Sequence, residues 1–474
     1  MIKIWDLTTY KIHIFINRAL YLLIMNWKLI TEQNPWWSNK LDNDIVEKYS
    51  TNIIKIERKN IDLDKGKVYF IKGPRRTGKT IYLKLIANKN LNCMYLNFDI
   101  LNDVKFSELE QNIKIYAERY DQIILLLDEI QSFKDWKEFL KALYDLGRFK
   151  SCTVIITGSD PREIEKGRQK MIGRSEETQI MAPLCFRDFL LNVCKTENKN
   201  LYDKLIANEI TLKNNIETIK IKYINLDAYF DEIEKYFNIY LLTGGFPETI
   251  NDYIKNLKTG AAKINSTYYE DIIEKIFEKM NKKISIDILK VIVDSITNTL
   301  KYSTIKNKTK YSEKTIKWYL NEMSELMLLF EIKEKQSNKL KKFYIKDPFI
   351  MHSIRTYYTS TNYFEDSFNT IMDEREKGIF VENCVAGHLH NLYNWNLEFY
   401  RDEKQKEVDF IVNKTAIEVK YRTKIEMPTL IKGVEEYILL TRFPVGLADL
   451  QINNRLAIPS CVFLAMLQKP LNFL

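Results

Sequence analysis

The sequence is poor in the residues that make flexible linkers. It has only 14 glycines and 10 prolines in 474 residues, and no long stretch rich in proline, glycine and serine. A chain of this length exceeds what one hydrophobic core usually serves, so two or three domains are expected. Apolar residues make up 45% of the chain, which is enough to supply those cores. The lack of linker composition predicts that short connections join the domains.

Cysteine and histidine are also scarce, and their spacing argues against a zinc site. The six cysteines are scattered without any Cys-x-x-Cys pair, which is typical of reduced thiols in an intracellular protein. Of the four histidines, only His388 and His390 lie close together. For this pair, a surface or capping role and a metal-binding role both stay open.

The sequence lacks an apolar run long enough to span a bilayer. The stretch 13–25 is broken by Asn17 and Arg18, and it is shorter than the ~20 residues that a spanning helix needs. We expect no membrane segment and a cytoplasmic protein, whose translation starts at Met1 or at Met25. The excess of 72 Lys and Arg over 63 Asp and Glu is modest, and it permits contact with DNA without requiring it.

One octapeptide fits the pattern G-x-x-x-x-G-K-[ST]. It follows the strand-like run 67–72 and precedes the helical run 81–87, the order that a phosphate-binding loop requires. Backbone N–H groups of the loop would surround the phosphates of ATP, Lys79 would neutralise phosphate charge, and Thr80 would place its hydroxyl on Mg²⁺. The alternative is a chance turn rich in glycine and lysine. The predicted nucleotide-binding residues of the loop are Gly73, Pro74, Arg75, Arg76, Thr77, Gly78, Lys79 and Thr80.

Two acidic residues follow a second apolar run. The run 123–127 predicts a buried central strand, which would deliver Asp128 and Glu129 to the C-terminal edge of the sheet, where open α/β sheets bind ligands. We expect Asp128 to hold the water shell of Mg²⁺ and Glu129 to polarise the attacking water. The plainer interpretation is a strand followed by an acidic helix cap.

A third buried strand, 151–157, ends in a polar segment. Thr157 or Ser159 would contact the γ-phosphate of ATP or orient the attacking water. An ordinary turn from strand to loop is the alternative.

These motifs occur in order with four further segments, which are Asn34-Pro-Trp-Trp37, Leu127–Gln131 with Trp136, Gly173-Arg174, and Pro183–Phe189. In this combination the chain, from about residue 32 to its end, resembles the AAA+-type P-loop ATPases of archaea and bacteria. Those proteins carry a C-terminal nuclease-like domain of unknown function. The resemblance implies that Arg174 stabilises charge at the γ-phosphate, in cis or from a neighbouring subunit, with Arg168 as a competitor. An arginine acting from a neighbour would require an oligomer.

The pattern between residues 286 and 350 indicates two helices followed by a hairpin, as in a winged helix. Ser312 would cap the second helix, and residues 330–335 and 341–345 would form the two strands of the wing. If this helix contacts DNA, the side chains facing it are Lys314, Lys317, Trp318 and Asn321. The alternative is a packing module whose lysines are simply solvated.

A second chemical pattern lies near the C-terminus. Period-two alternation places Glu418 and Lys420 on one face of a strand, Asp409 on the partner strand can join them, and Glu382 lies on a preceding helix. Such a group can bind Mg²⁺ and position a water for phosphodiester cleavage. It resembles the PD-(D/E)XK nuclease core, which implies catalytic roles for Asp409, Glu418 and Lys420 and metal-binding roles for Glu382, Asp409 and Glu418. Val408 stands where that core usually has proline, and some relatives of this type lack chemistry.

Together these patterns predict an α/β protein: a P-loop parallel-sheet ATPase core with a helical lid, a winged-helix segment and a C-terminal α/β nuclease-like domain. We expect it to bind ATP and Mg²⁺, to hydrolyse ATP, and to act on or near DNA. The alternative is a regulatory or assembly ATPase whose inactive C-terminal domain binds a protein partner. The expected domains are an N-terminal extension (1–50), the ATPase core (51–190), the helical lid or connector (191–280), the winged helix (281–350) and the nuclease-like domain (351–474).

Overall fold

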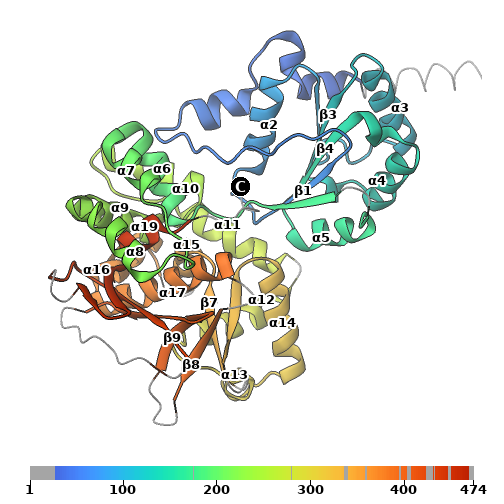
Figure 1. The fold of residues 1–474 in the computed structure, drawn as a ribbon. Helices are drawn as coiled ribbons and strands as arrows, with labels where there is room; N and C mark the ends of the chain where they lie inside the picture. The colour runs from blue at the N-terminus through green and yellow to red at the C-terminus, as the bar shows by residue number, and fades with distance from the viewer. Residues whose placement is uncertain are drawn as a thin grey trace, which may run out of the picture. The chain divides into compact units, whose positions relative to one another are not determined.

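The structure is a computed structural model with two compact units (Figure 1). It describes residues 27–173, 176–278, 280–335, 340–357, 360–393, 397–402, 407–422, 431, 433–446 and 450–468. The N-terminal unit comprises the residues up to 52 together with 58–182, and the C-terminal unit comprises 53–57 together with 183–473. The chain therefore crosses three times between the units, after residues 52, 57 and 182.

The N-terminal unit is built on a five-stranded parallel sheet with the order β2-β3-β4-β1-β5. Its inner strands β1, β3 and β4 are almost continuously apolar, because helices cover both of their faces. The strands are β1 (Val68–Lys72), β2 (Cys93–Asn97), β3 (Ile123–Asp128), β4 (Cys152–Gly158) and β5 (Glu176–Ile180). This confirms the predicted α/β class with a parallel-sheet core.

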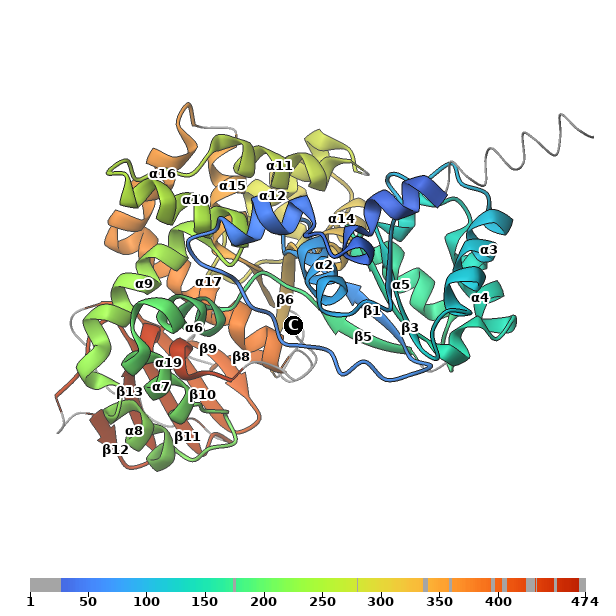
Figure 2. The ribbon, with the colours of Figure 1, turned by 90° about the horizontal axis from the view of Figure 1, so that it is seen from above.

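Helices cover the sheet of the N-terminal unit on two sides (Figure 2). One hydrophobic cluster joins a face of the sheet to α3 (Phe106–Ala117), α4 (Trp136–Asp145) and α5 (Pro161–Lys170). A second cluster joins the other face to α2 (Lys79–Lys89), which begins directly after the predicted phosphate-binding loop. The loop therefore lies at the C-terminal end of β1, where a parallel α/β sheet binds its ligands.

Side chains from the segment Asn34-Pro-Trp-Trp37 close the free edge of strand β2. The amide of Asn34 accepts a hydrogen bond from the backbone N–H of Tyr95 (2.7 Å) and donates one to the carbonyl of the same residue (2.8 Å). The neighbouring outward-facing groups of β2 also have partners. The carbonyl of Cys93 accepts hydrogen bonds from the indole N–H groups of Trp36 (3.3 Å) and Trp37 (2.8 Å). The backbone N–H of Asn97 donates to Gln33 Oε1 (2.7 Å). The outward-facing groups of this edge strand thus have hydrogen-bond partners, although β2 has a strand neighbour only on the side of β3.

Replacing Asn34 with leucine is expected to destabilise the N-terminal unit. The variant would leave the buried N–H and carbonyl of Tyr95 without partners, and each such group costs about 1–3 kcal/mol. We expect thermal unfolding to begin several degrees lower than in the wild type. Leucine at the exposed Asn43 is the matched control and should leave the unfolding temperature unchanged. Equal melting of the Asn34 variant and the wild type would show that the edge contacts contribute nothing.

The C-terminal unit combines many helices with an eight-stranded mixed sheet. Its helices are α6 (Phe186–Glu197), α7 (Lys199–Ala207), α8 (Ile216–Ile224), α9 (Phe230–Thr243), α10 (Pro247–Lys258), α11 (Ser266–Phe277), α12 (Lys282–Val293), α13 (Tyr302–Thr309), α14 (Glu313–Glu325), α15 (Pro348–Thr356), α16 (Tyr363–Met372), α17 (Glu374–Tyr393) and α19 (Ser460–Met466). One hydrophobic cluster runs through these helices and one face of the sheet. The predicted cap of α14 is present, since Ser312 Oγ accepts the N–H of Thr315 at 3.1 Å.

The predicted wing strands belong to the same sheet as the strands near the C-terminus. The sheet has the order β12-β13-β11-β10-β9-β8-β6-β7. Its strands are β6 (Leu329–Glu334), β7 (Lys341–Ile345), β8 (Leu397–Arg401), β9 (Glu407–Val412), β10 (Thr415–Lys420), β11 (Glu436–Thr441), β12 (Gln451–Ile452) and β13 (Arg455–Pro459). The hairpin β6–β7 joins the others through a short parallel pairing of Lys333 with Glu398 and of Glu334 with Phe399. The expected domain boundary at residue 350 therefore falls between strands of one sheet.

The segment around Gly244 and Gly245 forms a corner between α9 and α10. Gly244 has φ 58°, and an added Cβ there would lie 2.0 Å from the carboxylate of Asp347. That carboxylate accepts the backbone N–H groups of Gly245 and Phe349, both at 2.8 Å. Burial raises the pKa of Asp347 to about 7. Gly244 is thus needed for the close approach of a buried acid at this corner.

Two further features of the chain can be read from the described residues. None of the six cysteines, all of which lie in the described ranges, forms a disulfide bond. No helix in the described ranges is both long and apolar enough to cross a membrane. The apolar stretch 13–25 and the alternative start at Met25 lie outside the described residues.

Candidate functional site

The predicted phosphate-binding loop connects β1 to α2 in a tight backbone conformation. Gly78 has φ 92°, and Arg76 is also left-handed at φ 62°. A Cβ added at Gly73 would lie 2.0 Å from the carbonyl oxygen of Met181, so only glycine fits at the start of the loop. The spacing of the motif thus matches a turn that glycine makes possible at both ends.

Lys79 is buried inside this loop. Its Nζ donates hydrogen bonds to the carbonyl oxygens of Gly73 (2.9 Å) and Pro74 (2.7 Å). Burial lowers the pKa of Lys79 to about 8, although Glu129 and Asp128 oppose the shift. A phosphate placed in the loop would supply the negative charge that this buried ammonium lacks.

Asp128 lies at the end of β3 and gathers three hydroxyl groups. Its carboxylate accepts hydrogen bonds from Thr80 Oγ1 (2.8 Å), from the Tyr95 hydroxyl (2.8 Å) and from Thr157 Oγ1. The side chain is fully buried, and burial raises its pKa. Thr80 and Asp128 are the hydroxyl and carboxylate oxygens that bind Mg²⁺ in P-loop ATPases, so this donor set fits the expected metal.

Glu129 follows Asp128 in a strained conformation with φ 51°. Its carboxylate accepts a hydrogen bond from the backbone N–H of Ser159 (3.0 Å) and another from Gln131 Nε2 (2.5 Å). Gln131 Nε2 also lies 3.2 Å from Ser159 Oγ. The structure therefore brings the candidate base and the polar end of β4 together through Gln131, which the sequence had shown only as part of a motif.

Several arginines lie on or near the loop. Arg75 is exposed. Arg58, which the sequence did not single out, donates to the carbonyl oxygens of Thr77 (2.8 Å) and Ala182 (3.1 Å). It thus connects the phosphate-binding loop to the segment where the chain leaves the N-terminal unit.

The two arginines that the family resemblance offered for the γ-phosphate have different outcomes. Arg168 forms an ion pair with Glu165 at 2.6 Å. Arg174, the predicted charge-stabilising arginine, lies outside the described residues.

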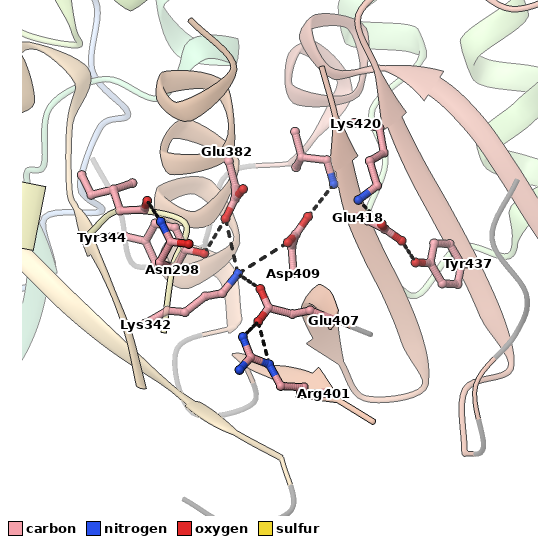
Figure 3. Close-up of polar contacts among 12 residues, drawn as sticks. Asn298, Lys342, Tyr344, Glu382, Arg401, Glu407, Asp409, Glu418, Lys420 and Tyr437 are labelled. Atoms are coloured by element: carbon pink, nitrogen blue, oxygen red, sulfur yellow. Dashed lines mark hydrogen bonds and ion pairs between the residues drawn. The ribbon is translucent and has the colours of Figure 1, made fainter. Parts of the chain in front are cut away.

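The second predicted group comes from α17, β9 and β10 of the C-terminal unit (Figure 3). Glu382 lies on α17, Asp409 on β9, and Glu418 and Lys420 on β10. The carboxylate of Asp409 accepts the backbone N–H of Val419 at 2.8 Å, which ties the two antiparallel strands together. Glu418 is buried, and its carboxylate contacts Lys420 on the same strand and the hydroxyl of Tyr437 on β11.

A residue that the sequence did not reveal lies in the middle of the carboxylates. Lys342 of β7 is completely buried, and its Nζ lies 2.6 Å from Glu407 Oε1, 3.5 Å from Glu382 Oε1 and 3.5 Å from Asp409 Oδ1 (Figure 3). Arg401 contacts the other oxygen of Glu407 at 2.6 Å. We call Lys342, Glu382, Glu407 and Asp409 the Lys342 cluster.

The pKa shifts in the Lys342 cluster follow from burial and from the closeness of the charges. Burial lowers the pKa of Lys342, but the three carboxylates outweigh that effect and raise it. Burial, helped by the charge of Asp409, raises the pKa of Glu382 to about 8. The hydroxyl of Tyr344 donates to Glu382 Oε1 at 2.8 Å. Across the described ranges, no three His, Cys, Asp or Glu side chains are arranged to hold a metal ion.

The pair His388 and His390 has partners within the protein. His388 Nε2 accepts the backbone N–H of Phe186 at 2.8 Å, and its Nδ1 lies 2.7 Å from Cys384 O. The ring of His390 lies against that of Phe330, and its Nδ1 is 2.7 Å from Lys346 Nζ. His388 is buried, so its contacts are those of a core residue rather than of a surface residue.

The parallel sheet, the phosphate-binding loop and the paired Thr80 and Asp128 define a P-loop ATPase domain. A family model described as an AAA domain matches residues 65–190, so the chain carries an ATPase domain of the AAA type. Two models described as domains of unknown function, DUF8612 and DUF4143, match residues 234–359 and 377–437. The match of the AAA domain confirms the ATPase part of the resemblance found in the sequence.

Two similar proteins come from the archaeon Methanocaldococcus jannaschii. Uncharacterized protein MJ1544 is 29% identical over 379 residues, which cover 76% of each chain. Uncharacterized protein MJ1637 is 25% identical over 359 residues, which cover 70% of this chain and 69% of that protein. Among solved structures, that of C. elegans PCH-2 aligns with 54% of this chain and 61% of its own at 14% identity and a TM-score of 0.21. A TM-score this low carries no argument about fold or function.

Proposed function

We propose that the N-terminal unit hydrolyses ATP with Mg²⁺ and that the C-terminal unit, which is nuclease-like, acts on or near DNA. The observation that carries the first part is the 2.8 Å hydrogen bond between Thr80 and Asp128 at the end of the phosphate-binding loop. When bound there, Mg²⁺ supplies charge neutralisation for the phosphates of ATP. Lys79 would bind the phosphates, and Glu129 would accept a proton from the attacking water.

Contact with DNA is supported by the exposed face of α14. Lys314, Lys317, Trp318 and Asn321 are all exposed, and Trp318 has 49% of its surface accessible although it is a large apolar side chain. Lysines on such a face neutralise phosphates, and an exposed indole can stack on a base. The opposite face of α14 is buried through Ile316, Tyr319, Leu320 and Met323. The helix is therefore amphipathic, with these polar side chains and Trp318 on its exposed face.

A nuclease-like role is supported by the arrangement of Glu382, Asp409, Glu418 and Lys420 on α17 and the hairpin β9–β10. A second candidate function is a regulatory or assembly ATPase whose C-terminal unit binds a protein partner and cuts nothing. The observation that favours it is the position of Glu418. Its carboxylate contacts the hydroxyl of Tyr437 and the ammonium group of Lys420, and these contacts do not involve Glu382 or Asp409.

Duplex DNA is expected to stimulate ATP turnover if the proposal is right. The double variant Lys314→Ala/Lys317→Ala should bind DNA more weakly. The slope of its log binding constant against log salt concentration should be about 2 units smaller, because two phosphate contacts are lost. The matched control, Lys204→Ala/Lys213→Ala, removes the same charge from exposed positions elsewhere and should behave as wild type. ATP turnover that ignores DNA would favour the second candidate.

The same preparations test cleavage. Plasmid DNA with Mg²⁺ or Mn²⁺ should be cut by the wild type and not by Asp409→Ala or Lys420→Ala, since both residues belong to the predicted nuclease-like group. A plasmid that stays intact with the wild type would contradict a nuclease role and leave the ATPase role in place.

A further inference from the structure

The centre of the Lys342 cluster is filled by a cation that belongs to the protein itself. The Lys342 side chain has no exposed surface, and its Nζ contacts carboxylates from both α17 and β9 (Figure 3). Two of them, Glu382 and Asp409, are among the three residues that the nuclease-like resemblance assigns to the metal ion, and Glu418 is the third. The ammonium group therefore competes for the same oxygens as the metal.

The distances within the cluster suit an ammonium group and not a divalent metal. Mg²⁺ binds carboxylate oxygens at about 2.0–2.1 Å and Ca²⁺ at about 2.3–2.6 Å. The three oxygens lie 2.6 to 3.5 Å from Lys342 Nζ, the range of charge-assisted hydrogen bonds and close ion pairs. The two centres cannot be occupied together, because a metal placed among these oxygens would collide with Nζ. The residues present do not fit the metal that the nuclease-like resemblance implies.

The charges of the cluster are also largely compensated. Three carboxylates, those of Glu382, Glu407 and Asp409, face two cations, Lys342 and Arg401. Adding a divalent cation would place two further positive charges next to a buried ammonium, which is strongly unfavourable in a desolvated site. Electrostatics therefore opposes metal binding for as long as Lys342 stays in place.

We propose that Lys342 is the resident cation of this cluster and that a divalent metal enters only when the ammonium group is withdrawn. The inference rests on the proposed function in one respect, since the carboxylates are the candidate metal ligands of the nuclease-like domain. It assigns to Lys342 a blocking role, so that the C-terminal unit binds no metal at Glu382 and Asp409 while the ammonium group stays in place.

The backbone of the strand that carries Lys342 is held at several points. Strand β7 lies at the edge of the sheet, where it pairs with β6, and its Lys341 also forms an isolated bridge with Leu300. The backbone of Ile345 exchanges two hydrogen bonds with the side chain of Asn383 on α17, at 2.8 and 2.9 Å. Metal entry therefore requires the Lys342 ammonium group itself to move away from the carboxylates.

Binding of Mn²⁺ tests this inference directly. The full chain is used without nucleotide in an Asp128→Asn background, which removes the metal ligand of the N-terminal unit. Free Mn²⁺ is followed by electron paramagnetic resonance for the parent and for Lys342→Met. We expect the parent to bind no Mn²⁺ in the C-terminal unit and the Met variant to gain one site, at least about tenfold tighter than any site of the parent. Adding Glu382→Gln should remove the gained site.

Lys341→Met is the matched control, because Lys341 is the adjacent lysine on β7 and pairs with Glu331 instead, at 2.8 Å. It should bind Mn²⁺ as the parent does. If Lys342→Met fails to fold by circular dichroism, Lys342→Gln is used, since its amide can still donate hydrogen bonds to the carboxylates. A parent that binds Mn²⁺ through Glu382, or a folded Lys342 variant that gains no site, would overturn the inference. If the Lys342 variant gains the Mn²⁺ site but plasmid DNA is not cut, only the nuclease proposal is overturned.

Discussion

Replacing Lys79 with alanine is expected to lower ATP turnover by at least about 10²-fold and to weaken nucleotide binding. The ammonium group lies within the phosphate-binding loop, 2.9 Å from Gly73 O and 2.7 Å from Pro74 O, at the place where the β- and γ-phosphates would be held. Alanine removes the charge that compensates these phosphates. Phosphate release measures the turnover, and titration with a fluorescent ATP analogue measures the affinity.

The matched control for this variant is Lys89→Ala, at the other end of the same helix. Lys89 is exposed and lies in the last turn of α2, far from the loop. It should leave both turnover and affinity at the wild-type level. Unchanged turnover and affinity in Lys79→Ala would contradict the identification of the loop as the nucleotide site.

Glu129→Gln is expected to separate ATP binding from hydrolysis. The glutamine keeps the shape of the side chain but cannot accept a proton, and general bases contribute about 10²–10⁴-fold to a rate. Turnover should therefore fall by that factor, while ATP affinity stays close to the wild-type value. Single-turnover phosphate release measures the chemical step separately from binding.

Glu118→Gln serves as the control for the Glu129 variant, because Glu118 is an exposed acid at the end of α3. Its turnover should equal that of the wild type. If Glu129→Gln also hydrolysed ATP at the wild-type rate, another group would have to act as the base. If it lost ATP affinity instead, Glu129 would have a structural role through Gln131 and Ser159.

The architecture of the ATPase core could be predicted from the sequence because its signals are local. Strands β1, β3 and β4 are continuous apolar runs, and the polar residues that end them lie at one edge of a parallel sheet. The contacts of Asn34 with β2 join residues 61 positions apart, and no local pattern indicates them. The joining of β6 to β8 was missed for the same reason, because strand partners far apart in sequence leave no periodic signal.

The same difference between local and long-range contacts decides which residues of the candidate sites could be predicted. The phosphate-binding loop is one continuous octapeptide, so its spacing alone indicated Lys79 and Thr80. Lys342 carries no such signal, because it follows another lysine in a chain rich in lysine. Only the alternation of side chains along β7, which turns Lys341 toward Glu331 and Lys342 toward the carboxylates, distinguishes the two.

The closed edge of β2 limits how copies of this protein can associate. An exposed edge strand offers its N–H and carbonyl groups to any extended segment, including the same strand of another copy. Here Asn34 occupies the groups of Tyr95, and the indoles of Trp36 and Trp37 occupy the carbonyl of Cys93. Strand addition at this edge is therefore blocked. An oligomer that brought an arginine to a neighbour's nucleotide could therefore not form by adding a strand at β2.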